Sequence, residues 1–246
     1  MGQVPQSSFI NPVLIIGNGR VARHFFFYLQ SHGIPCVQWY RSSGQDLESL
    51  CREHSPRIVL VLIHDTAIEG WIREHTDLSS RTVVHFSGAL VTPLALGMHP
   101  LMSFGPDLYD LSFYEHIPFI GEEGKPSFRD LFPNLKNPVY SIPSSEKAYY
   151  HALCVLSGNF TVILWQKLFH AFEPRLKLAP SVAKPYLDQV MRNLQNNPIG
   201  ALTGPLQRGD VRTIDANLKA LDGDLFQEIY QSFVDVYQKV QSEVQK

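Results

Sequence analysis

The stretch that decides the fold runs from Val13 to Ala22 and reads VLIIGNGRVA. Its four apolar residues end in a glycine, which is typical of a parallel strand buried between two layers of helices. After the turn, Val21, Phe25 and Leu29 recur every four positions and therefore share one face of a helix. A strand, a glycine turn and a helix in this order predict the first unit of an α/β sheet.

The glycine turn has the pattern G-x-G-x-x-A. Gly17 permits a tight turn, Gly19 lets a pyrophosphate approach the backbone, and Ala22 lets the helix pack close to the strand. The free N–H groups and the positive dipole end of the helix suit phosphates. In this setting the pattern predicts a dinucleotide site, with a purely structural turn as the alternative. The residues expected to contact the cofactor here are Gly17, Asn18, Gly19, Arg20 and Val21.

The corner after the second predicted strand, Pro35 to Tyr40, indicates which dinucleotide binds. An NAD site usually carries an acidic residue about 20 positions on, which binds the ribose hydroxyls. Here the strand is followed by Arg41, Ser42 and Ser43, with no acid. Arg41 offers a cation to a 2′-phosphate and a plane to adenine, and the two serines offer hydroxyl donors. The corner predicts NADP rather than NAD; an exposed arginine beside a turn is the alternative.

The rest of the chain predicts two domains. Strands expected at 57–63 and 82–86 alternate with helices expected at 47–54 and 67–75, and strand candidates at 117–120 and 139–142 could extend the sheet. From Ser144 on, the pattern favours helices only, at 144–172, 181–194, 211–221 and 225–244, with a serine cap at 144 or 145. We therefore expect a Rossmann-type doubly wound, mainly parallel sheet in residues 1–143, followed by an all-helical domain in residues 144–246.

Polar residues follow two further strands at their carboxyl ends, where ligands bind in open α/β sheets. Asp65 follows the third predicted strand, and Ser87 and Gly88 follow the fourth. All three are expected beside the cofactor. For Asp65 the alternative is a cap on the next helix.

Three residues are candidates for proton transfer. His99 lies beyond the last clear parallel strand, and an imidazole suits proton exchange with an alcohol or a carbonyl. Lys147 and His151 are spaced i, i+4, so both side chains can reach one cleft. The alternatives are a packed core histidine and a surface lysine. Four other histidines are expected at solvent-facing positions, namely His24, His32, His54 and His75.

Composition narrows the function classes. The net charge of -2 argues against wrapping of nucleic acid or of an anionic membrane. We expect no apolar stretch of roughly 18 residues and no signal peptide, which favours a cytoplasmic protein. The three cysteines are far apart and predict neither a disulfide framework nor a metal site.

These motifs together resemble a group of bacterial proteins with a Rossmann-like NADP-binding domain and a 6-phosphogluconate-dehydrogenase-like helical C-terminal domain. The resemblance rests on the residues 15–22, 41–43, 85–90, 99–101, 147–151, 202–205 and 208–210. It implies an NADP-dependent oxidoreductase and a homodimer formed through the helical domain. It names no substrate.

A resemblance to more distant relatives indicates roles for individual site residues. His99 and Ser87 resemble the catalytic histidine and the assisting serine of prephenate dehydrogenases. Lys147 resembles the catalytic lysine of 3-hydroxyacid dehydrogenases and ketopantoate reductase, but His151 stands where those enzymes carry an asparagine. The leading hypothesis is hydride transfer between the nicotinamide and a small polar or anionic carbonyl, imine or hydroxy compound. The alternatives are a non-catalytic NADP-binding sensor or interaction protein and a purely structural Rossmann scaffold.

Overall fold

The computed structural model describes residues 11–78 and 80–244. The chain divides into two compact units, Met1–Leu164 and Trp165–Lys246. Each unit is described by itself below.

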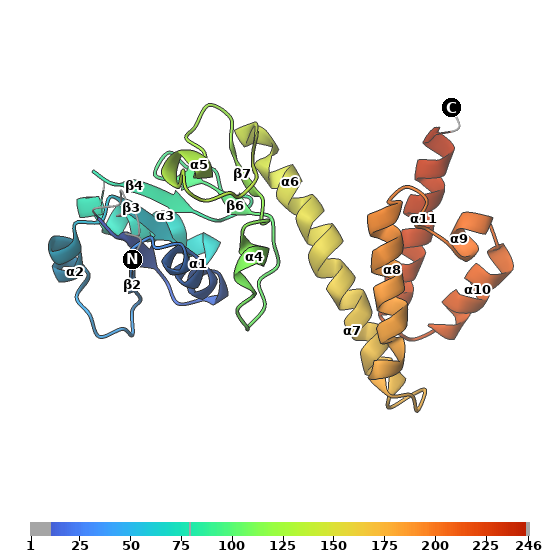
Figure 1. Cartoon of the computed structure of the whole chain (residues 1–246). Coiled ribbons are helices and arrows are strands. Elements are labelled where there is room, and N and C mark those ends of the chain that lie inside the picture. The colour runs from blue at the N-terminus through green and yellow to red at the C-terminus, as the bar shows by residue number, and fades with distance from the viewer. Residues whose placement is uncertain (1–10, 79, 245–246) are drawn as a thin grey trace, which may run out of the picture. The chain divides into compact units, whose positions relative to one another are not determined.

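The first unit is built on a five-stranded parallel sheet with the order β2-β1-β3-β4-β5 (Figure 1). The strands are β1 (Val13–Ile16), β2 (Cys36–Trp39), β3 (Ile58–Val61), β4 (Thr82–His85) and β5 (Leu96–Gly97). β1 pairs with β2 on one side and with β3 on the other, so the strand order reverses at β1. All five carboxyl ends therefore meet at one edge of the sheet.

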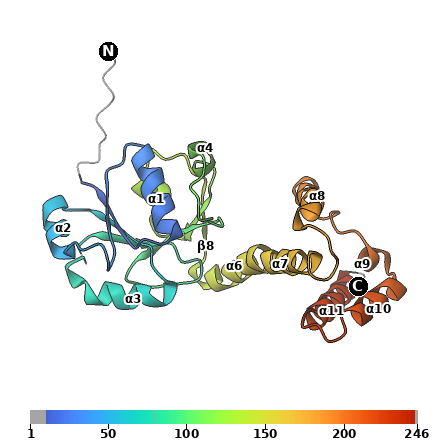
Figure 2. The same ribbon diagram turned by 90° about the horizontal axis from the view of Figure 1, so that it is seen from below.

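Helices cover both faces of this sheet. Figure 2 shows α1 (Arg20–Ser31) on one face, and α2 (Leu47–His54) and α3 (Asp65–Glu74) on the other. Side chains alternate along a strand, and β1 shows the consequence. Val13 and Ile15 pack into the core under α1, whereas Leu14 and Ile16 pack under α2 and α3. The predicted doubly wound fold is confirmed.

A second, three-stranded sheet follows, made of β6 (His99–Pro100), β7 (Phe119–Glu122) and β8 (Val139–Ile142). β6 is antiparallel to β7, and β7 is parallel to β8. The expectation that these segments extend the main sheet was wrong, because the chain leaves that sheet at Met98 and starts a new one. Besides the 3-10 turn η1 (Thr76–Leu78), the unit contains α4 (Leu111–Tyr114) and α5 (Phe128–Leu131).

His24 corrects a second expectation. Its side chain is fully buried on α1, with Nδ1 2.6 Å from the Tyr114 hydroxyl and Nε2 3.0 Å from the Gly105 carbonyl oxygen. The two bonds satisfy both ring nitrogens, which permits burial of a polar ring in this core. His24 is therefore a structural residue and not a solvated one.

A long helix runs from Ser144 to Phe172, as predicted. It comprises the 3-10 turn η2 (Ser144–Glu146), α6 (Lys147–Cys154), the π-helical segment η3 (Val155–Asn159) and α7 (Phe160–Phe172). No serine caps it, because the Ser144 hydroxyl donates to Glu122 instead, at 2.6 Å. The first unit ends inside this helix, whereas the sequence placed the boundary at residue 143.

The long helix also bears on the expected absence of a membrane segment. Its 29 residues include a window with a mean hydropathy of 1.4, which satisfies the length and composition needed to cross a bilayer. The expectation that no stretch reaches this limit was wrong. The apolar side chains in that window are not buried within the chain.

The second unit is helical, with η4 (Pro180–Ala183), α8 (Lys184–Asn196), α9 (Pro205–Arg208), α10 (Val211–Ala220) and α11 (Phe226–Val244). Asp210 caps α10, accepting from the Thr213 backbone N–H at 3.1 Å. Among the described residues of this unit, the buried apolar side chains are Ala183, Ile214 and Val234. The unit thus leaves much apolar surface exposed.

Candidate functional site

The glycine turn after β1 is shaped by backbone contacts. Gly17 has φ +117°, and a Cβ there would lie 2.3 Å from the Leu62 carbonyl oxygen, so only glycine fits. Its N–H donates to the Trp39 carbonyl at 2.8 Å, and its own carbonyl accepts from the Gln38 side chain at 2.7 Å. At Gly19, by contrast, a Cβ would meet no atom within 4 Å. The turn is therefore fixed by backbone contacts at Gly17 and free of contacts at Gly19.

A pocket of about 860 Å³ lies against this turn. It is formed at the carboxyl ends of β1, β3 and β4, where the strand order reverses. Its lining residues are Gly17, Asn18, Gly19, Arg20, Val21, Val61, Leu62, Ile63, His64, Asp65, Thr66, Ile68, Phe86 and Ser87. Seven of the predicted cofactor contacts belong to this set. Position, open volume and a helix start suit the pyrophosphate of a dinucleotide.

The remaining predicted contacts lie outside that lining. Arg41 and Ser42 are exposed just after β2, in a turn closed by a 2.8 Å bond from the Ser43 N–H to the Tyr40 carbonyl. Arg41 takes part in none of the ion pairs formed within residues 11–78 and 80–244. Its guanidinium is thus available to an external anion at the β2 end of the sheet.

Ser87 and Asp65 join the ends of β4 and β3. The Ser87 hydroxyl donates to Asp65 Oδ2 at 2.5 Å and accepts from the Leu90 N–H at 3.1 Å. Asp65 lies in the first turn of α3 but does not cap it; the N-cap is His64, which makes no side-chain bond. The capping alternative for Asp65 was wrong, because its carboxylate binds Ser87.

A buried charged cluster surrounds Gly97, at the same edge of the sheet. The Lys147 side chain is 2% exposed, and its Nζ lies 3.5 Å from Glu122 Oε1. A Cβ on Gly97 would lie 2.2 Å from that Nζ, so the ammonium group rests directly on the strand backbone. Glu122 Oε2 accepts from Lys125 Nζ at 2.8 Å and from the Ser144 hydroxyl at 2.6 Å. The alternative of a surface lysine at 147 was therefore wrong.

The two predicted histidines lie beside each other. The rings of His99 and His151 are 5.5 Å apart and nearly perpendicular, and His99 Nδ1 lies 2.7 Å from the Tyr150 hydroxyl. A Cβ on Gly88 would lie 2.2 Å from His151 Nδ1, which is buried and has no hydrogen-bond partner among the described residues. Lys147 and His151 do share one helix face, and this face contacts Gly97 and Gly88.

His85 is a member of the cluster that the sequence analysis missed. It ends β4, is 0% exposed, and its Nδ1 accepts from the Ser87 N–H at 3.2 Å. The proton of the neutral ring is therefore on Nε2, which has no partner among the described residues. Burial, assisted by the charge of Lys147, lowers the pKa of His85 to about 4. The ring is thus neutral at neutral pH and presents an unused donor.

Charges in the cluster follow from burial and pairing. Burial, with help from His151 and Lys147, lowers the pKa of His99 to about 4. Burial also lowers the pKa of Lys147, but Glu122 opposes this effect. For Glu122, burial acts to raise the pKa, and the bonds from Lys125 and Ser144 outweigh it, so the pKa falls. Lys147 and Glu122 therefore form an ion pair beside neutral histidines.

Glu122 and Tyr150 were also missed by the sequence analysis. Glu122 ends a short apolar strand, FIGE, and a carboxylate at a strand end is the signal that could have found it. Tyr150 lies between two predicted candidates on α6 and gives no signal of its own. Within the described ranges, no group of three or more His, Cys, Asp or Glu side chains is placed to hold a metal ion.

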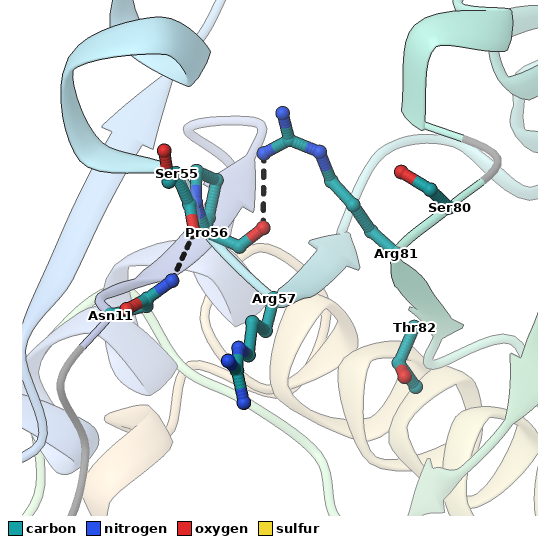
Figure 3. Close-up of a pocket in the computed structure, with 7 residues that line it drawn as sticks. All are labelled: Asn11, Ser55, Pro56, Arg57, Ser80, Arg81 and Thr82. Atoms are coloured by element: carbon teal, nitrogen blue, oxygen red, sulfur yellow. Dashed lines mark hydrogen bonds between the residues drawn. The ribbon is translucent and has the colours of Figure 1, made fainter.

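A different pocket, of about 430 Å³, lies at the amino ends of β3 and β4 (Figure 3). Arg81 donates to the Pro56 carbonyl at 3.0 Å, and Asn11 donates to the Ser55 carbonyl at 2.6 Å. The Arg57 side chain points away from Arg81 in Figure 3. The two cations do not converge on a ligand, which leaves the carboxyl edge as the candidate site.

The sequence and the structure were compared with known proteins. Residues 121–236 match the family model "Domain of unknown function (DUF2520)". No curated protein matches the sequence significantly.

Several solved structures are similar over nearly the whole chain. A "putative NADP oxidoreductase" from Bacteroides fragilis has a TM-score of 0.75 at 20% identity, covering 93% of this chain and 98% of its own. The protein TM1727 from Thermotoga maritima has a TM-score of 0.65 at 21% identity, with 95% and 100% covered. An imine reductase from Streptomyces aurantiacus has a TM-score of 0.62 at 14% identity, with 93% of each chain covered. The predicted resemblance to NADP-binding, oxidoreductase-like proteins is confirmed at the level of the fold.

Proposed function

We propose that this protein is an NADP-dependent oxidoreductase. It transfers hydride between the nicotinamide and a small polar or anionic carbonyl, imine or hydroxy compound. The observation that carries the proposal is the connection between the open pocket and the buried cluster. Ser87 lines the pocket, and its backbone N–H donates to His85 within the cluster, so the pocket proposed for the cofactor and the proposed proton donors lie at one edge of the sheet. The similar proteins include imine reductases and a reductive aminase in complex with NADPH4, which supports this class.

The cofactor proposal is NADP held by the glycine turn and the Arg41 corner. The helix start at Gly19 and Arg20 receives the pyrophosphate, and Arg41, Ser42 and Ser43 receive the 2′-phosphate. The bound cofactor supplies the hydride chemistry. One similar imine reductase, from Myxococcus stipitatus, is in complex with NAD+, so the fold alone does not select the cofactor.

Arg41→Asp tests this preference. We expect the wild-type protein to bind NADPH at least tenfold more tightly than NADH, and the variant to reverse the order, because a carboxylate repels the 2′-phosphate and binds ribose hydroxyls. Nicotinamide fluorescence in a titration measures both affinities. The exposed Arg23→Asp serves as the charge-matched control. Equal affinities in the wild-type protein would contradict the role of Arg41.

In the proposed reaction, Lys147, His99 and His151 act on the substrate. The Lys147 ammonium polarises the carbonyl or imine and donates a proton to it. His99 is neutral and orients the substrate; when the Tyr150 hydroxyl donates to its Nδ1, its Nε2–H is free for that bond. Ser87 ties Asp65 to the cluster and keeps the two strand ends in register. These roles are electrostatic positioning and proton transfer.

The competing function is a dinucleotide-binding sensor without turnover. NADPH oxidation with a panel of oxo acids and cyclic imines separates the two. We expect Lys147→Met and His99→Ala to reduce turnover at least a hundredfold while NADPH affinity stays within threefold. Tight NADPH binding with no turnover on the whole panel would favour the sensor.

We also propose a cytoplasmic homodimer formed through the helical domain, with a small-molecule substrate. Exposed apolar side chains on the long helix support it: Leu156 is 55% exposed, Phe160 46% and Ile163 44%. A soluble protein buries such a face against a partner, and a second copy does so without a membrane. Analytical ultracentrifugation of the wild-type protein and of Leu156→Glu tests this: we expect a dimer and a monomer, respectively. Recovery of the wild-type protein only in the membrane fraction would overturn the location.

A further inference from the structure

The Glu122 carboxylate holds an unusual position for an ionised group. Its side chain is 0% exposed, and its two oxygens serve different partners. Oε2 binds Lys125, whose side chain is 33% exposed, and Ser144, whereas Oε1 faces Lys147. Burying a carboxylate costs several kcal/mol unless donors surround it. Here the donors are Lys125, which is partly exposed, and Ser144 and Lys147, so the carboxylate connects the surface to the buried cluster.

Two roles are consistent with such a carboxylate. In a purely structural role, Glu122 would only join β7 to the start of the long helix. The bonds from Lys125 and Ser144 to its Oε2 are sufficient for that role. Oε1 makes its contact with Lys147 in addition. The Nζ at the other end fills the space where a Cβ on Gly97 would be, and His85 Cε1 lies 3.1 Å from that same point. The location of the ammonium group is thus defined by Glu122 on one side and by backbone on the other.

We propose that Glu122 is the positioning residue for Lys147, and that its Oε1 fixes the ammonium group against Gly97 beside the unpartnered Nε2–H of His85. The inference rests on the proposed function of Lys147. Glu122 does not touch the substrate; it acts through the lysine. The donors of Lys147 and the unpartnered Nε2–H of His85 suit an acceptor, such as a carbonyl oxygen or an imine nitrogen, better than a second cation.

The charges around Lys147 make the role measurable. The groups that face it are Glu122 and Lys125 from β7 and its following turn, Asp65 from α3, His85 from β4 and His99 from β6. Burial lowers the pKa of Lys147, and Glu122 is the largest opposing influence. Without the carboxylate, the pKa of Lys147 falls further, and the lysine loses its proton at lower pH. Lys125 acts in the opposite direction, since its charge lowers the same pKa.

The test is the titration of Lys147 in the full chain, followed by NMR of lysine labelled at Cε and Nζ. Lys147→Met identifies the signal. We expect Glu122→Gln to lower the titration midpoint by more than one pH unit, Glu122→Asp to lower it less, and Lys125→Ala to leave it unchanged or raise it. An unchanged midpoint in Glu122→Gln would overturn the proposal.

Two arrangements keep the result interpretable. If Glu122→Gln does not fold, Glu122→Asp and Ser144→Ala replace it in the titration, because both keep the negative charge but move the carboxylate. An unshifted titration midpoint of Lys147 in both variants would then overturn the proposal. The titration requires neither cofactor nor turnover. Failure to bind NADPH would therefore refute the proposed function and leave this result standing. With a substrate in hand, Glu122→Gln should lower kcat at high pH and change KM little.

Discussion

The glycine-turn pocket and the Gly97 cluster lie at the same edge of one sheet, but they are built differently. The pocket is lined by the glycine turn, residues 17–21, and by residues at the ends of β3 and β4, and the start of α1 offers it backbone N–H groups. The cluster joins Glu122 to Lys147, 25 residues apart, and His99 to Tyr150, 51 residues apart. The glycine turn is thus local in the sequence and open at Gly19, whereas the cluster joins distant segments and is buried.

The pocket and the cluster also differ in what they cost in folding free energy. The open pocket leaves its polar groups hydrated, so it adds little cost to folding. The cluster removes two opposite charges and His85 from water, and such groups are stable only while each partner is present. We therefore expect changes in backbone geometry to disrupt the pocket, and changes in protonation to destabilise the cluster.

The largest effect should come from Gly17→Ala. The new Cβ would lie 2.3 Å from the Leu62 carbonyl oxygen at φ +117°, so β1 and β3 must separate or the turn must rearrange. We expect a loss of at least about 3 kcal/mol in the free energy of unfolding, measured by urea denaturation.

Gly19→Ala is the matched control, because a Cβ there meets nothing within 4 Å. Its stability should stay within about 0.5 kcal/mol of the wild type. NADPH affinity should nevertheless fall at least tenfold, since the methyl group enters the space proposed for the pyrophosphate. Unchanged affinity would contradict a dinucleotide at this turn.

An acid titration tests the cluster. His85 and His99 both have a pKa near 4, against 6.5 for a free histidine. The unfolded chain thus binds more protons between these values, and stability falls as the pH drops from 6.5 to 4. The shift corresponds to about 3 kcal/mol for each histidine at full effect.

Urea denaturation at closely spaced pH values measures this loss. In His85→Gln the slope between pH 6.5 and 4 should be about half that of the wild type, because one of the two groups is gone. His54, whose side chain is 36% exposed, serves as the control, and His54→Gln should leave the slope unchanged. A wild-type stability that is flat in this range would refute the burial of neutral histidines.

The same contrast explains how much the sequence predicted. The alternation around β1 specifies the fold, since Val13 and Ile15 face one layer while Leu14 and Ile16 face the other. The i, i+4 spacing of Lys147 and His151 placed both on one face of α6. Glu122 and His85 depend on how β7 and β4 are packed against that helix. No spacing within the chain encodes that packing, so these two partners required the structure.

The smallest effect is expected at the opposite end of the sheet, in the pocket of Figure 3. Arg81→Ala removes one hydrogen bond, to the Pro56 carbonyl, and should cost about 1 kcal/mol of stability. Arg57 is exposed, and its side chain forms none of the hydrogen bonds found within residues 11–78 and 80–244, so Arg57→Ala should cost less than about 0.5 kcal/mol. NADPH affinity should stay within twofold in both variants, because parallel strands place the two pockets at opposite edges. A tenfold loss of affinity in either variant would show that the amino edge takes part in binding, and the assignment of the site to the carboxyl edge would then be wrong.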